Sequence, residues 1–144
     1  DVGLLGCLSR VEWDELAANH FSGLLAEQYV AQHLSLFHGP LRTPELHYWL
    51  NDKKSHRAEV DFLLQTGSKV LPVEVKSGSP GQMKSLLTYL ALHASVKRAI
   101  HLGPHSFSVG KLDYKLAQEK ESVRVNRQLI QVPLYLVDRL KQIL

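Results

Sequence analysis

The sequence predicts a single α/β domain, spanning residues 1–144, in which helices flank a mixed central β-sheet. Residues 57–78 alternate apolar and charged side chains on both sides of Gly67-Ser68, a pattern typical of two antiparallel strands joined by a tight turn. Residues 70–102 follow the order strand, helix, strand, and such a crossover predicts a parallel pair. Residues 21–37 repeat apolar side chains at helical spacing, which predicts a long helix before the hairpin.

Composition sets the outer limits. A chain of 144 residues with 44% hydrophobic content is large enough for one domain with its own core. No apolar run approaches the ~20 residues of a membrane span, so no membrane association is expected. The single cysteine, Cys7, favours the reducing cytoplasm, and the net charge of +3 is compatible with nucleic-acid binding. The chain opens on Asp1 without a charged-then-apolar leader, which predicts a fragment of a longer protein.

The hairpin brings four charged residues together. With Gly67-Ser68 at the centre of a type II′ turn, Asp61 faces Glu74 and Glu59 faces Lys76, and all four side chains share one face. Two carboxylates directly opposite each other repel unless a divalent cation or a shared proton neutralises them.

A surface hairpin is the alternative. Glu59 with Lys76 alone would be an ordinary solvated ion pair. However, apolar Leu63 and Pro72 share the charged face, which indicates a strand pair covered on both sides. Acids in such a place need a partner or a function.

Asp61 followed by Glu74-Val75-Lys76 on the next strand resembles the PD-(D/E)xK nuclease superfamily. The resemblance implies a restriction-endonuclease-like fold and metal-dependent cleavage of nucleic acid. DNA is expected as the substrate rather than RNA. It also implies that Asp61, Glu74 and the backbone carbonyl of Val75 hold Mg²⁺ or Mn²⁺, and that Lys76 orients or activates the attacking water. Val60 stands where the family name has Pro.

A further acid, Glu27, lies in the long helix, three residues from Leu24 and from Val30. This spacing places Glu27 on the apolar face, where it is either an inward-facing ligand or a boundary residue that reaches water or pairs with an Arg. The superfamily resemblance favours the first, because a helical Glu before the hairpin recurs there as an additional catalytic and metal-site acid.

The first part of the chain also resembles a carboxy-terminal domain of unknown function that follows the ATPase module of many bacterial and archaeal AAA-type ATPases. The shared features are the Asp-x-Gly-Leu opening at residues 1–4, the Glu27 helix, Tyr48-Trp49, and the acid-bearing strands up to residue 78. The resemblance implies an ATPase domain of the same protein as a partner.

The remaining elements are predicted from local signals. A capping box at Ser9 opens a short helix to Asn19, and residues 46–50 form a strand. The polar run at residues 51–57, with Lys53, Lys54, His56 and Arg57, either grips phosphates or simply forms a hairpin loop, and the second is favoured.

Residues 78–85 resemble a phosphate-binding P-loop, but Met83 replaces its second Gly and Pro80 removes an amide donor, so nucleotide binding is not expected. Pro80 instead opens a helix to Ala94. His101 and His105 are expected in a loop. The later expectations are short strands at 107–109, 112–114 and 129–132, a solvated turn at 117–121, and a docking helix from residue 133.

Two functions follow from this sequence. The first is metal-dependent phosphodiester hydrolysis of nucleic acid, carried by Asp61, Glu74 and Lys76 with help from Glu27. The second is a non-catalytic domain of the same fold that binds DNA or protein, or that regulates an attached ATPase.

Overall fold

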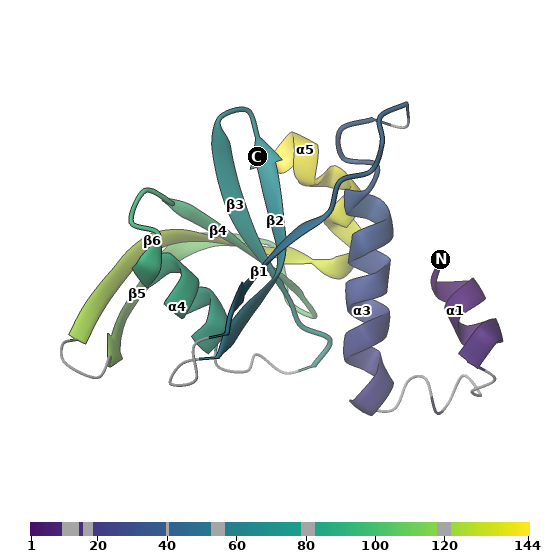
Figure 1. Cartoon of the computed structure of the whole chain (residues 1–144), viewed down its shortest axis with the longest axis horizontal. Helices are drawn as coiled ribbons and strands as arrows, with labels where there is room; N and C mark the ends of the chain where they lie inside the picture. The colour runs from purple at the N-terminus through teal and green to yellow at the C-terminus, as the bar shows by residue number, and fades with distance from the viewer. Residues whose placement is uncertain (10–14, 16–18, 40, 53–56, 79–82, 118–121) are drawn as a thin grey trace.

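The structure of the chain is a computed structural model that describes residues 1–9, 15, 19–39, 41–52, 57–78, 83–117 and 122–144. It contains a six-stranded mixed sheet with the strand order β1-β2-β3-β4-β6-β5 (Figure 1). The strands are β1 (His47–Asn51), β2 (Ala58–Thr66), β3 (Lys69–Val75), β4 (Arg98–Gly103), β5 (Ser108–Ala117) and β6 (Ser122–Pro133). β4 lies parallel to β3 and β6, and the other neighbouring pairs are antiparallel. The predicted mixed sheet is therefore confirmed.

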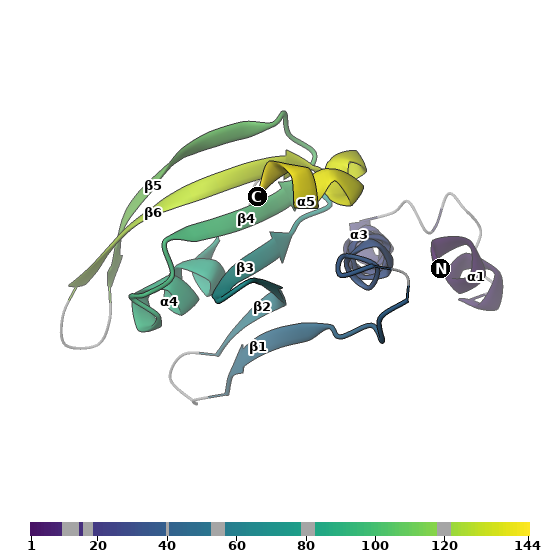
Figure 2. The ribbon, with the colours of Figure 1, turned by 90° about the horizontal axis from the view of Figure 1, so that it is seen from above.

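Helices cover both faces of this sheet (Figure 2). The described helices are α1 (Val2–Ser9), α3 (Asn19–Leu34), α4 (Lys84–Leu92), the 3-10 helix η1 (Leu134–Arg139) and α5 (Leu140–Ile143). Of these, α1 lies beyond α3 and away from the sheet (Figure 2). α3, η1 and α5 pack on one face, in a core that we call the α3-side core and that includes Val30, Val73, Val75, Ile100, Ile130 and Leu140. α4 packs on the other face, in the α4-side core, which includes Val60, Leu86, Leu90, Ala99, Val125 and Leu129.

The β2–β3 hairpin has the predicted register. The pairs run from Thr66↔Lys69 at the turn to Phe62↔Val73. Gly67 has a φ of 59°, a conformation that L side chains rarely adopt, so glycine is favoured in this turn. Pro72 stands one residue before the first pair with β4, Val73↔Ile100, and because it has no N–H it cannot extend that ladder.

Several predicted boundaries are wrong. Ser9 is the last residue of α1, and the helix that it was predicted to cap lies almost entirely outside the described residues. α4 begins at Lys84, and Pro80, its predicted first residue, is outside the described part of the chain, as are Lys53, Lys54, His56 and residues 118–121. The predicted late strands belong to one long antiparallel hairpin, β5–β6.

The C-terminal residues dock as expected, since Val137 and Leu140 are buried against the α3-side core. Within the described residues, no helix has both the length and the apolar character needed to cross a bilayer.

Candidate functional site at the fork between two strands

Asp61 lies in a β-bulge. His47 of β1 pairs with Leu63 of β2, but Trp49 pairs with Val60. Asp61 and Phe62 therefore lie opposite the single residue Tyr48. A bulge shifts the alternation of side chains by one residue and re-aims them. Val60 accordingly packs in the α4-side core, whereas Phe62 packs in the α3-side core.

The bulge corrects the prediction that the four charged side chains share one face. Asp61 follows inward-facing Val60 and is directed towards the α3 side, whereas Glu74 alternates with Val73 and Val75 and is directed towards the α4 side. The β2–β3 ladder also ends at Phe62↔Val73, one pair short of Asp61 and Glu74. The two acids thus meet at the fork where the strands part.

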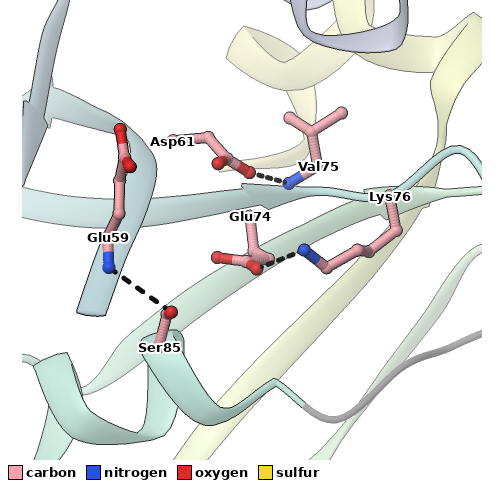
Figure 3. Close-up of polar contacts among 6 residues, drawn as sticks. All are labelled: Glu59, Asp61, Glu74, Val75, Lys76 and Ser85. Carbon is pink, nitrogen blue, oxygen red and sulfur yellow. Dashed lines mark hydrogen bonds and ion pairs between the residues drawn. The ribbon is translucent and has the colours of Figure 1, made fainter. Parts of the chain in front are cut away.

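The Asp61 carboxylate takes part in the backbone hydrogen bonding of this fork. Its Oδ2 accepts the N–H of Val75 at 2.7 Å (Figure 3). The N–H of Lys76 turns the other way and donates to the carbonyl of Leu102 at 2.8 Å. Because the β2–β3 ladder ends at Phe62↔Val73, Lys76 does not pair with Glu59 as predicted.

Glu74 and Lys76 form an ion pair at the fork. The Lys76 Nζ lies 2.7 Å from Oε1 of Glu74, and its side chain curls back along β3 to reach it (Figure 3). Glu74 is only 3% exposed, and its second oxygen, Oε2, is buried with no hydrogen-bond partner among the described residues. Half of this carboxylate is thus unsatisfied within the part of the chain that the structure describes.

Glu27 reaches the same region from α3. The helix buries Ala26, Val30 and Leu34, and Glu27 lies beside this row, half-buried. The first turns of α3 also touch the end of β3, because the hydroxyls of Ser22 and Ser77 lie 3.0 Å apart. The predicted inward direction of Glu27 is consistent with this placement, although Leu24, which was assigned to the same face, is exposed.

The electrostatics show that these groups act on one another. Burial raises the pKa of Glu27, Asp61 and Glu74, and the charge of Asp61 raises the pKa of both Glu27 and Glu74 further. Burial opposes the charge on Lys76, but the hydrogen bond to Glu74 and the three carboxylates outweigh it and raise the pKa of Lys76. The fork therefore concentrates negative charge that one ammonium only partly offsets.

The fork offers oxygen ligands that suit a divalent cation. Carboxylate oxygens are the ligands that Mg²⁺ and Mn²⁺ prefer, and the fork supplies them from Asp61 and from the buried Oε2 of Glu74, which has no partner among the described residues. Across the described part of the chain, no three His, Cys, Asp or Glu side chains lie close enough to hold a metal together. Glu27 thus adds negative charge near Asp61 and Glu74 but does not form a three-carboxylate metal cluster with them. Two carboxylates still suffice for Mg²⁺, which retains several waters.

Of the two histidines near the fork, His105 lies in a loop as predicted, but His101 was misplaced. His101 lies in β4, not in a loop, and pairs with Glu74 across the parallel ladder. It is 1% exposed, and its ring lies 4.7 Å from that of His105. All four ring nitrogens of the pair are buried, with no hydrogen-bond partner in the described part of the chain. Burial lowers the pKa of His101 to about 4, with further contributions from His105 and Lys76. The apolar neighbours of His101 in the sequence were the signal that it lies in a strand.

Replacing Lys76 with Met should lower the free energy of unfolding at pH 7 by about 2 kcal/mol, because buried Glu74 would lose its counter-charge. Protonation of Glu74 limits this loss. Urea unfolding followed by circular dichroism measures it, with Lys69→Met at the exposed hairpin tip as the control. The double variant Glu74→Gln/Lys76→Met should regain most of the stability. A single variant as stable as the wild type would show that the ion pair contributes nothing.

The fold and the site define a mixed α/β domain with a buried carboxylate–lysine pair at a strand fork. The sequence profile of a family described as "Domain of unknown function (DUF4143)" matches residues 22–135, and the chain belongs to this family. The match confirms the expected domain of unknown function, and it extends well past residue 78 but omits the opening residues. No curated protein matches the chain.

Proposed function

We propose that this domain is a metal-dependent nucleic-acid phosphodiesterase of the PD-(D/E)xK type. The observation that supports it best is the buried Glu74 carboxylate with its unpartnered Oε2, adjacent to Lys76 and within the field of Asp61. Asp61, Glu74 and the backbone carbonyl of Val75 would hold Mg²⁺ or Mn²⁺. When bound, the cation would lower the pKa of a water and stabilise negative charge on the phosphate.

Lys76 and Glu27 would have separate roles in the hydrolysis. Lys76 has a raised pKa and stays protonated at neutral pH, so it positions the attacking water or a phosphate oxygen and does not act as a base. Glu27 has a raised pKa because it is partly buried beside Asp61. A carboxylate of this kind is suited to accept the proton that the attacking water releases.

A second candidate function is a non-catalytic domain of the same fold that binds DNA or protein, or that regulates an ATPase module preceding it in the full protein. One observation favours it. Asp61 already accepts the Val75 N–H, and Lys76 already pairs with Glu74, so both groups have partners without an ion.

Calorimetric titration of Mn²⁺ and of Mg²⁺ into chelator-stripped protein separates the two. If the domain is a phosphodiesterase, the wild type should bind the metal ion saturably, and both Asp61→Asn and Glu74→Gln should abolish this binding. Glu59→Gln is the matched control, because Glu59 is an exposed acid two residues from Asp61 on the same strand. Absence of saturable heat in the wild type would favour the non-catalytic domain.

A further inference from the structure

The α3-side face of the sheet continues past α3 onto β4, β6 and β5, where it is polar. Ile100 and Ile130 belong to the α3-side core, so Arg98 and Gln128, two residues before each, point to the same face. Arg98 pairs with Gln128, and Gln128 pairs with Lys111 of β5. Arg98, Gln128 and Lys111 therefore form a row across three adjacent strands.

This row extends along the β5–β6 hairpin. Asp113 pairs with Asn126, and Lys115 pairs with Arg124. The same alternation directs Leu112 and Leu116 to the α4-side core, which leaves their neighbours on the open face. We call this surface the basic face, and its residues are Arg98, Lys111, Asp113, Lys115, Arg124, Asn126 and Gln128.

The charge of the basic face is one-sided. Four of its side chains are cationic and one is acidic, and all five are exposed. The acid, Asp113, is held by Arg124 through two hydrogen bonds of 2.8 and 2.6 Å. Arg98, Lys111 and Lys115 therefore remain as cations that Asp113 does not neutralise.

A groove overlaps part of the basic face. It has a volume of about 340 Å³ and is lined by Lys111, Asn126 and Gln128 of that face together with Lys97, Val109, Gly110 and Arg127. No carboxylate lines it among the described residues. Arg98 and Lys111 stand two strands apart, or ~10 Å, which corresponds to the rise of about three nucleotides. Lysine and arginine bind phosphates, whereas Asn and Gln amides donate hydrogen bonds to sugar and phosphate oxygens.

We propose that the basic face binds the sugar–phosphate backbone of DNA and thereby supplies substrate to the fork. This inference rests on the proposed function for its partner, but its residues are separate from the fork. On β4, Arg98 lies three residues before His101, which pairs with Glu74, so the face begins ~10 Å along the strand from the level of the candidate site. It lies on the α3 side of the sheet, the side towards which Asp61 is directed and Glu74 is not.

Fluorescence anisotropy with a labelled 20-nucleotide DNA, single-stranded and duplex, tests the proposal in EDTA, where metal-dependent cleavage is suppressed. The triple variant Arg98→Ser/Lys111→Ser/Lys115→Ser should bind at least tenfold more weakly than the wild type, and the slope of log K against log salt should fall by about 2 to 3. Asp113→Asn should strengthen binding. The matched control is Arg42→Ser/Lys84→Ser/Lys141→Ser, which removes the same charge from exposed positions outside the basic face and should retain most of the affinity.

The outcomes distinguish this inference from the proposed function. Equal losses in the two triple variants would overturn the basic face as the binding surface, even if metal binding at Asp61 and Glu74 is found. Selective loss in the first triple variant would support it, even if the fork binds no metal. Displacement of DNA by poly-glutamate at equal charge would also overturn it, because an acidic protein would then fit equally well.

Discussion

Asp61→Asn should abolish metal-dependent cleavage of nucleic acid while leaving the domain folded. An amide is a far weaker ligand for Mg²⁺ than a carboxylate, so the loss of one acid from a two-carboxylate site should reduce the rate by at least a hundredfold. The fold should tolerate the change, because the amide oxygen of Asn can still accept the Val75 N–H. Loss of a half-buried negative charge next to Glu27 and Glu74 also removes repulsion.

The measurement is cleavage of labelled single-stranded and duplex DNA in Mg²⁺ and in Mn²⁺, with circular dichroism as the check on folding. Glu59→Gln, the exposed neighbour on the same strand, should cleave like the wild type. Cleavage by Asp61→Asn at the wild-type rate would remove the fork as the catalytic site.

His101 should make the stability of the domain depend on pH between about 6.5 and 4. Its folded-state pKa of about 4 lies below the ordinary value of 6.5, so the folded state binds fewer protons than the unfolded state. The contribution of neutral His101 to the free energy of unfolding is therefore complete above pH 6.5 and is lost as the pH falls towards 4. The loss should reach about 3 kcal/mol at pH 4.

Urea unfolding of the wild type and of His101→Leu in EDTA, at several pH values from 7 to 4, isolates this contribution. The wild type should lose about 3 kcal/mol more than the variant over this interval, because other titrating groups are common to both proteins. His47→Gln, at an exposed histidine, is the control and should follow the wild type. Parallel curves for the wild type and His101→Leu would mean that burial does not keep the His101 ring neutral in the folded protein.

The sequence predicted much of the fold because its signals were local. The turn at Gly67 fixed the register of the hairpin as far as Phe62↔Val73, and the strand–helix–strand order predicted the parallel β3–β4 pair. The β5–β6 hairpin was underestimated because Lys111, Asp113 and Lys115 interrupt its apolar residues, although such alternation is the mark of a strand with one solvated face.

The site was predicted less well than the fold. The bulge at Asp61 depends on the partner strand β1, and nothing in residues 57–78 specifies it. A simple hairpin therefore placed Asp61 and Glu74 on one face, whereas the structure brings them to the fork from two sides. The burial of His101 likewise depends on the strands on either side of β4, which lie far away in the sequence.

The β-bulge in β2 also links the position of Asp61 to the packing of the core. If the bulge were lost, every residue before Asp61 would rotate by half a turn, and Val60, now fully buried, would be exchanged for Glu59. A variant that straightens β2 to bring Asp61 directly opposite Glu74 would therefore place a charge inside the protein. The burial of Val60 in the core thus fixes the direction of the Asp61 side chain. Changing that direction would require part of the core around Val60 to unfold.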